Sequence, residues 1–242
     1  MKAAPMALIG GTSLLESDHF RTLPERTVQT AYGDVQLRVS DRWVFLQRHG
    51  VASYTPPHLI NHRANLTALQ EIGVERVLAI GSVGSMRPEL APGALVVPDD
   101  FLSMQPPPTL YDDARGHCVP GFDPQWRAQV MAAFQGIEEV EPVDGGVYWQ
   151  SVGPRFETPA EIRMMQSHTH LVGMTVASES TLATELELPY AAICMVDNYA
   201  NGVAGDVLSF EAFKQQVRDN QAVMLRLVEA LLVHLAPAPE IA

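Results

Sequence analysis

Residues 61–85, NHRANLTALQEIGVERVLAIGSVGS, place a helix, a strand and a glycine-rich segment directly after one another. Apolar residues recur at helical spacing over 61–72, and Gly73 ends the pattern, so we expect a helix there. The apolar run 76–80 predicts a buried strand, and the glycines and serines of 81–85 predict a tight turn at its end. A helix that leads into a fully apolar strand is typical of an α/β fold.

The same alternation continues on both sides of this stretch. Expected strands lie at 6–9, in three pieces within 27–47, and at 94–97, 146–152, 170–174 and 189–196. Further expected helices lie at 158–167, 178–187 and 210–235. Residues 104–123, rich in Pro, Asp and Gly, predict a long excursion. We therefore expect one α/β domain over 1–242, with a central mixed sheet flanked by helices and a frayed tail at 235–242.

Composition narrows the class of protein. The 242 residues are 47% hydrophobic and 18% charged, which provides for a packed core and excludes a disordered chain. The net charge of −12 argues against a nucleic-acid partner, because such a partner requires a basic surface. No run reaches the ~18 apolar residues of a membrane helix, so we expect no membrane partner. Two cysteines, Cys118 and Cys194, are too few for a disulfide framework and indicate a cytoplasmic protein.

Residues suited to ligand binding follow several of the expected strands. These segments are 10–13 (GGTS), 48–50 (RHG), 81–85 (GSVGS) and 197–199 (DNY). Ligands of open α/β sheets bind at the carboxyl ends of strands. The glycine-rich segments offer backbone N–H groups and hydroxyls, and Arg48 and His49 add side-chain donors, which together suit a phosphate. Neither segment matches the Walker or Rossmann pattern, and the alternative interpretation is that the glycines only form tight turns.

A different set of residues suits a flat, polar ring. Phe156 could stack on such a ring while the carboxylate of Glu157 accepts an N–H from it. The amide of Asn198 could bond to the edge of a base through both its donor and its acceptor. Each also has a structural interpretation: a core Phe beside a helix N-terminal box, a turn Asn and, for Met174, a core residue.

No combination of residues predicts a metal site or a covalent nucleophile. His168 and His170 have metal-like spacing, but they lie at an expected helix-to-strand junction without a third ligand. The chain also shows no Ser-His-Asp order and no nucleophile-elbow motif. We therefore expect no metal.

Five longer motifs occur in order along most of the chain. They are IGGTSLLES (9–17), LQRHG (46–50), INHRANLTALQEIGVERVLAIGSVGSMRPELAPGALVVPDDFL (60–102), SVGPRFETPAEIRMM (151–165) and LVGMTVASESTLA (171–183). Together they resemble the family of trimeric purine nucleoside phosphorylases and methylthioadenosine phosphorylases. The resemblance implies an α/β phosphorylase fold without a metal and a homotrimer with sites near subunit interfaces. In such a trimer, we expect residues 104–123, including His117, to reach a neighbouring subunit's site.

The resemblance also implies a reaction. It is reversible phosphorolysis, in which a purine nucleoside and phosphate give a free purine and ribose 1-phosphate. Inorganic phosphate is then a co-substrate, and no cofactor is required. The transition state resembles an oxocarbenium ion, so the site must place an anion below the sugar and stabilise negative charge on the leaving purine.

Roles follow for residues that match the family's motifs. The implied phosphate-binding residues are Thr12, Arg48, His49 and Ser82, and the implied catalytic residues are Asn198, His49 and Arg48. The implied purine-binding residues are Phe156, Glu157 and Asn198, and the sugar is expected to be lined by Gly81, Ser82 and Met174. These roles agree with the donors and acceptors described above.

Glu157 and Asn198 determine which purine is expected. The resemblance implies that the adenine-preferring branch of the family has the motif PRFS and an Asp at the position of Asn198. This chain has PRFE and Asn198 instead, which is similar to the 6-oxopurine branch. An ionised Glu157 only accepts, which suits the N1–H of hypoxanthine or guanine, whereas N1 of adenine is itself an acceptor. Asn198 can donate to O6 and accept from N7–H. Because a buried acceptor without a donor costs ~1–3 kcal/mol, we expect 6-oxopurine nucleosides such as inosine and guanosine.

The 5′ end of the sugar indicates a methylthio group. The resemblance implies a His near the 5′-hydroxyl in ordinary 6-oxopurine phosphorylases, but this chain has none between His170 and His234. The corresponding segment contains Phe210 and Phe213, an apolar wall that suits a methylthio group. We therefore expect 5′-methylthioinosine to be accepted beside inosine. The alternatives are a 5′-methylthioadenosine phosphorylase and a nucleoside-binding protein without catalysis.

Overall fold

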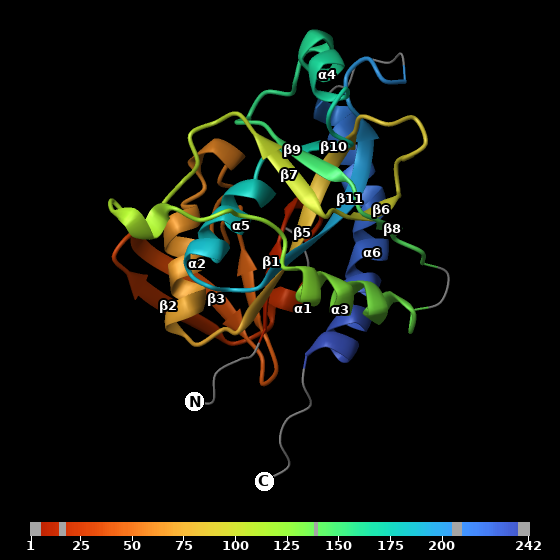
Figure 1. Ribbon diagram of the computed structural model, residues 1–242. Helices are drawn as coiled ribbons and strands as arrows, with labels where there is room; N and C mark the ends of the chain where they lie inside the picture. The colour runs from red at the N-terminus through yellow and green to blue at the C-terminus, as the bar shows by residue number, and fades with distance from the viewer. Residues whose placement is uncertain (1–5, 15–17, 138–139, 205–209, 237–242) are drawn as a thin grey trace.

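The computed structural model describes residues 6–14, 18–137, 140–204 and 210–236, the side chains at 210 and 212 excepted. Within these ranges eleven strands form one sheet with helices on both faces (Figure 1). The strands are β1 (Met6–Gly10), β2 (Glu25–Thr30), β3 (Gly33–Val39), β4 (Val44–Gln47), β5 (Arg76–Ser85), β6 (Leu95–Val97), β7 (Asp100–Ser103), β8 (Val143–Asp144), β9 (Val147–Gln150), β10 (Leu171–Gly173) and β11 (Tyr190–Tyr199). The helices are α1 (Asp18–Arg21), α2 (His62–Glu71), α3 (Pro124–Phe134), α4 (Pro159–Met165), α5 (Val176–Glu185) and α6 (Phe210–Leu235), with short 3-10 turns η1 (Thr12–Leu14), η2 (Pro57–Leu59) and η3 (Ala114–Gly116).

Four parallel strands form the middle of the sheet. β1 pairs with β4 on one side and β5 on the other, and β5 pairs with β11. Their side chains are mostly buried because helices lie over both faces. The antiparallel pair β2–β3 forms one edge, and β10, β9 and β7 extend the sheet beyond β5. The predicted mixed sheet flanked by helices is thereby confirmed.

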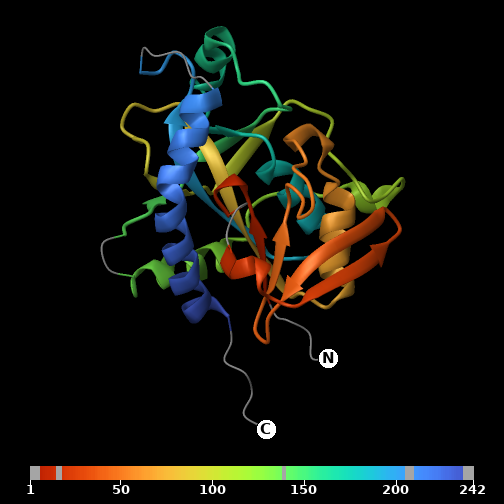
Figure 2. The ribbon, with the colours of Figure 1, turned by 180° about the vertical axis from the view of Figure 1, so that it is seen from behind.

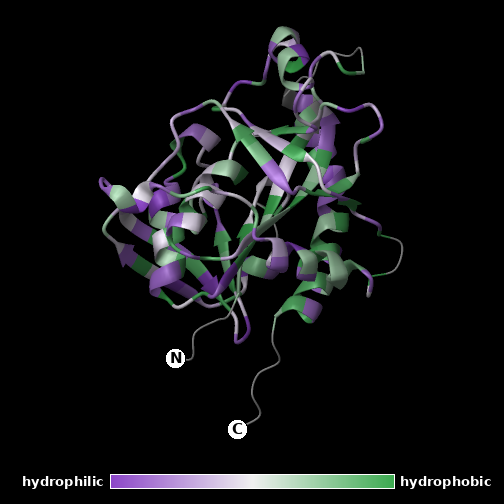
Figure 3. Cartoon of the chain, viewed as in Figure 1, coloured by the Kyte–Doolittle hydropathy of each residue, from purple (hydrophilic) through white to green (hydrophobic). Residues whose placement is uncertain are grey.

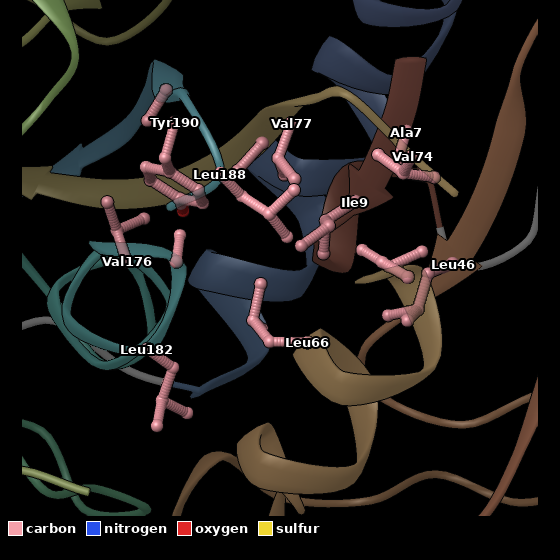
Figure 4. Close-up of a cluster of buried hydrophobic side chains, with 14 of the residues drawn as sticks. Ala7, Ile9, Leu46, Leu66, Val74, Val77, Val176, Leu182, Leu188 and Tyr190 are labelled. Carbon is pink, nitrogen blue, oxygen red and sulfur yellow. The ribbon is translucent and has the colours of Figure 1, made fainter. Parts of the chain in front are cut away.

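The two faces of the sheet carry separate hydrophobic cores. Helices α2 and α5 cover one face, where Leu66, Val176 and Leu182 pack against strand residues (Figure 4). Helices α3 and α6 cover the other face, seen from behind in Figure 2, and contribute Trp126 and Met224. Figure 3 shows the hydropathy of each described residue of the chain. Each large apolar side chain buried in this way stabilises the fold by ~1.5–3 kcal/mol.

Local sequence signals set the starts of several helices. The Asn61 side chain accepts from the Ala64 N–H and caps α2, which confirms the expected helix. Thr158 and Glu161 form a complete capping box at the start of α4, as predicted. The excursion at 104–123 is also confirmed, with η3 inside it.

The expected turn at 81–85 is wrong, because β5 continues as a strand through Ser85. Its last residues pair with β11 on one side and with β10 on the other. A Cβ added to Gly81 would lie 3.1 Å from Cys194 Sγ, so this glycine permits close packing of strands rather than a turn. β11 likewise runs three residues beyond its expected end at Val196, and Asn198 lies inside it next to a bulge.

Other differences concern element limits. Helix α3 was not predicted, although Asp123 caps it and Pro124 occupies its first position. Helix α5 begins at Val176, two residues before its expected start. Ala236, which directly follows α6, is buried, so the expected fraying does not begin at 235. Residues 237–242 of the expected frayed tail lie outside the described part of the chain.

Candidate active site

A cavity of about 330 Å³ lies where β1, β4, β5 and β11 approach their carboxyl ends. This is the edge of an α/β sheet at which ligands usually bind. The predicted site residues that line it are Thr12, Arg48, His49, Ser82, Phe156, Glu157, Met174, Asn198 and Phe213. Two predicted residues differ: Gly81 faces Cys194 and Val176 within the sheet rather than the cavity, and the side chain of Phe210 lies outside the described residues.

Arg48 is held in place by a buried carboxylate. Its Nε and Nη2 donate to the two oxygens of Glu179 over 2.5 and 3.1 Å, and both side chains are only 1% exposed. Its Nη1 donates to the Ile80 carbonyl over 2.7 Å, and the Tyr190 hydroxyl donates to Glu179 over 2.7 Å. Among the residues that the structure describes, three of the five guanidinium N–H groups are therefore used, and two remain for a ligand.

Close packing around Arg48 requires glycine at position 11. A Cβ at Gly11 would lie 2.5 Å from the Ile80 carbonyl oxygen and 2.7 Å from Arg48 Nη1. The Ile80 oxygen belongs to the backbone of β5 and has little freedom to move. Sequence analysis interpreted the glycine-rich segment 10–13 as a phosphate-binding segment. Gly11 of that segment also leaves room for the Arg48 guanidinium.

His49 is a neutral ring at pH 7. Burial and the neighbouring Arg48 lower its pKa to about 4. Its Nδ1 lies 2.9 Å from the Thr55 carbonyl oxygen, so the neutral ring holds its proton there and has an acceptor at Nε2. Tyr54 stacks on this ring with a centroid separation of 5.5 Å and also lines the cavity. An anion beside the ring favours its protonated form, in which Nε2 donates.

Another part of the cavity wall combines aromatic rings with a carboxylate and an amide. Phe156 packs edge-on against Phe213 of α6, with ring centroids 5.5 Å apart. Glu157 is 8% exposed, and burial raises the pKa of its carboxyl. Its Oε1 has no hydrogen-bond partner among the described residues. Asn198 donates one N–H to the Tyr199 carbonyl over 2.8 Å, which leaves the second N–H of that amide nitrogen.

Sequence reasoning missed Thr175, which lines the cavity between Met174 and the first turn of α5. A hydroxyl at a helix N-terminus is well placed to meet an anion. Its position directly after Met174, in front of a run of helix formers, was the available signal. Residues 104–123 contribute nothing to this cavity's lining, and Leu110 of that segment is tied to Glu185 and Tyr32 instead.

Ser82 is bonded to a buried acid, Asp197, which sequence analysis placed at a strand end without giving it a role of its own. The Ser82 hydroxyl donates to the carboxylate of Asp197, and Asn220 of α6 donates to the other oxygen over 2.8 Å. Asp197 is 1% exposed, and burial raises its pKa.

Over the described residues, no group of three His, Cys, Asp or Glu side chains is placed to hold a metal ion. The cavity is lined by hydroxyls, a guanidinium, an imidazole, a carboxylate and an amide around an apolar wall.

Residues 5–233 match the sequence model of the Phosphorylase superfamily. The chain belongs to this superfamily. The chain is 34% identical over 246 residues to the 6-oxopurine nucleoside phosphorylase of Pyrococcus furiosus. The alignment covers 94% of this chain and 91% of that protein. It is 38% identical over 236 residues to a protein of Methanothermobacter thermautotrophicus named "Probable S-methyl-5'-thioinosine phosphorylase", covering 94% of this chain and 83% of the relative.

The fold of the chain is also found in solved structures. The methylthioadenosine phosphorylase from Schistosoma mansoni in complex with adenine superposes with a TM-score of 0.80 at 24% identity, over 94% of this chain and 90% of that one.

Among the described residues of the chain, no helix is both long enough and apolar enough to cross a bilayer.

Proposed function

We propose that the chain is a purine nucleoside phosphorylase, a pentosyltransferase that prefers 6-oxopurines and accepts a 5′-methylthio group. It converts inosine, guanosine or 5′-methylthioinosine, with phosphate, into a free purine and the corresponding ribose 1-phosphate. Membership of the superfamily and the names of the relatives support the reaction class.

The observation that carries the purine preference is the carboxylate of Glu157. It is buried beside Phe156 and Asn198, and its Oε1 lacks a partner among the described residues. A buried carboxylate oxygen without a donor is costly, and the N1–H of a 6-oxopurine is a donor that would satisfy it. Adenine presents an acceptor at N1 and leaves that oxygen unsatisfied.

The chemistry divides between two groups of residues. Thr12, Arg48 and His49 hold the phosphate, one oxygen of which attacks C1′ of the sugar. The bond from C1′ to N9 breaks, and its electron pair passes into the purine, where N7 takes up a proton. Asn198 accepts from that N7–H and donates to O6, so charge on the leaving base is stabilised where it develops. Phe156 stacks on the base and keeps it aligned.

The 5′ substituent meets an apolar surface. Phe213 of α6 lines the cavity next to Phe156, and Met174 lines it from the end of β10. Burying a methylthio group against such side chains is favourable, whereas a hydroxyl there needs a polar partner. The M. thermautotrophicus relative carries the methylthioinosine activity in its name, which favours the same substrate here.

We further propose a homotrimer in the cytoplasm. Tyr54 lines the cavity and Leu59 ends the neighbouring turn η2. They are 55% and 64% exposed, as residues covered by a neighbouring subunit are in an isolated chain. Cys118 and Cys194 are both free, which suits a reducing compartment. Light scattering is expected to give three times the chain mass of 26.5 kDa, and a fully active monomer would contradict the proposal.

The test of the function is release of hypoxanthine from inosine with and without phosphate. We expect release only with phosphate, and Glu157→Ala lowers kcat/KM for inosine by about 10- to 100-fold while changing adenosine much less. Glu75→Ala, at an exposed glutamate, is the matched control. Phosphate-independent release would indicate hydrolysis instead, and binding of hypoxanthine without any release would indicate a nucleoside-binding protein.

A further inference from the structure

A second cavity adjoins the first at Glu157. It has a volume of about 200 Å³, and among the described residues Glu157 alone lines both cavities. The rest of the lining comes from β9, from the segments that follow β7 and β9, and from α4, and includes Met104, Trp149, Ser151 and Met165. The carboxylate that we assign to the purine therefore stands at the boundary between the two cavities.

Several polar side chains of the second cavity already have partners. The Gln150 amide donates to Ser178 Oγ over 2.6 Å and accepts from the Ser178 N–H over 3.0 Å. Arg155 donates to the two oxygens of Glu161 over 2.9 and 2.7 Å. A ligand that used these groups would first have to break existing bonds.

The hydroxyl of Ser151 and the carboxylate of Glu157 differ from these groups. In the described lining of the second cavity, Ser151 Oγ and Glu157 Oε1 are the buried side-chain atoms that have no hydrogen-bond partner. Ser151 is fixed directly after β9, where its N–H donates to the Gly173 carbonyl over 2.8 Å. The two side chains are neighbours: burial raises the pKa of Glu157, and the nearby Ser151 hydroxyl acts on that pKa in the opposite direction. A group with two N–H donors would satisfy both oxygens.

The order of these polar groups matches one edge of guanine. Along that edge the 6-oxygen, the N1–H and the 2-amino group follow one another. Asn198 lines the first cavity, Glu157 lines both, and Ser151 lines the second. With O6 at Asn198 and N1–H at Glu157, the substituent at C2 lies on the side of Glu157 that is remote from Asn198, which is the side of the second cavity.

We propose that the second cavity is a subsite for the substituent at C2 of the purine, where Ser151 accepts one N–H of the 2-amino group, so that guanosine is preferred to inosine. The inference rests on the proposed phosphorylase function and deepens it by naming the base. A carboxylate has about four lone-pair sites, so Glu157 accepts both the N1–H and the other N–H of the amino group. Hypoxanthine carries only hydrogen at C2 and leaves Ser151 Oγ without a partner.

The size of the second cavity extends the inference to substituted amino groups. A site needs only ~10–15 Å³ to hold a water molecule, and the second cavity has about 200 Å³. A methyl group on the 2-amino nitrogen therefore has room beside the apolar side chains of Met104, Trp149 and Met165.

The experiment measures kcat/KM for guanosine, inosine and N²-methylguanosine at saturating phosphate. The wild type is expected to prefer guanosine to inosine by about tenfold or more, and to accept N²-methylguanosine within about tenfold of guanosine. Ser151→Ala is expected to lower kcat/KM for guanosine by about three- to tenfold and that for inosine by less than about twofold, because only guanosine bonds to this hydroxyl.

Ser167→Ala is the matched control, because Ser167 is an exposed serine shortly after α4 and lines neither cavity. It is expected to leave the ratio of guanosine to inosine unchanged. Equal wild-type rates with these two nucleosides would overturn the inference. An equal loss for both in Ser151→Ala would also overturn it, since Ser151 would then only support Glu157.

The wild type provides a further test that needs no variant. Rejection of N²-methylguanosine by an enzyme that accepts guanosine would place the C2 substituent outside the second cavity and overturn the inference. Absence of phosphorolysis with every nucleoside would instead remove the proposed function, and this inference with it.

Discussion

Removal of Glu179 tests how the phosphate-binding guanidinium is held. In Glu179→Ala, Arg48 keeps its bond to the Ile80 carbonyl but loses both bonds to the carboxylate. Removing one partner of a buried ion pair costs ~3–5 kcal/mol because the other charge stays buried. Because Arg48 keeps its bond to the Ile80 carbonyl and lines the cavity, we expect the lower end, ~3 kcal/mol. For a chain of this size that lowers Tm by roughly 6–12 °C.

The same substitution is expected to impair phosphate binding. Without Glu179 the guanidinium loses its fixed orientation, so the KM for phosphate rises by about tenfold or more while the KM for inosine changes less. Stability is measured by urea unfolding and activity by initial rates over a range of phosphate concentrations. The double variant Arg48→Met, Glu179→Leu is expected to recover most of the stability and none of the phosphate affinity, because it removes the buried charges together.

Glu75→Ala serves again as the control and is expected to change the free energy of unfolding by less than about 0.5 kcal/mol. Our reasoning would be refuted if Glu179→Ala cost less than about 1 kcal/mol, since the pair would then not be a desolvated one. An unchanged KM for phosphate in a folded Glu179→Ala enzyme would refute the positioning of Arg48.

Three further outcomes are expected. Asn198→Asp shifts the kcat/KM ratio of inosine to adenosine toward adenosine by about tenfold, because a carboxylate accepts from the 6-amino group; an unaltered ratio counts against the base-edge argument. The same ratio falls in the wild type as the pH is lowered through the raised pKa of Glu157, since burial raises that pKa and protonated Glu157 donates to N1 of adenine; Glu157→Ala should show a flat profile. Phe213→Ala lowers the preference for 5′-methylthioinosine over inosine by about tenfold, and an unchanged ratio places the methylthio group elsewhere.

Much of the site could be predicted because its residues follow strands. Thr12 follows β1 and Arg48 follows β4. The pattern of expected strands was therefore enough to predict that both residues lie at one edge of the sheet. Phe156 and Glu157 lie in a loop where no periodicity exists, so residue chemistry suggested a ring-binding role beside a structural alternative, and the family resemblance favoured the ring-binding role. The superfamily match confirms that resemblance.

The errors share a physical cause, which is that tertiary packing overrides local signals. Gly81 resembles a turn residue, but it lies in β5 and pairs with Cys194 of β11, where an added Cβ would approach Cys194 Sγ to 3.1 Å. The partner of Arg48 is Glu179, 131 residues away, and no sequence pattern links the two. Sequence analysis placed Asp197 in the segment that follows a strand. The structure places it at a bulge inside β11, where it bonds to Ser82.

The most direct test of the central claim is phosphate-dependent base release from inosine, guanosine, adenosine, 5′-methylthioinosine and 5′-methylthioadenosine, measured side by side. We expect both 6-oxopurine nucleosides to exceed adenosine, and 5′-methylthioinosine to exceed 5′-methylthioadenosine, by about tenfold or more in kcat/KM. A preference for 5′-methylthioadenosine would contradict the roles given to Glu157 and Asn198 while leaving the superfamily assignment intact.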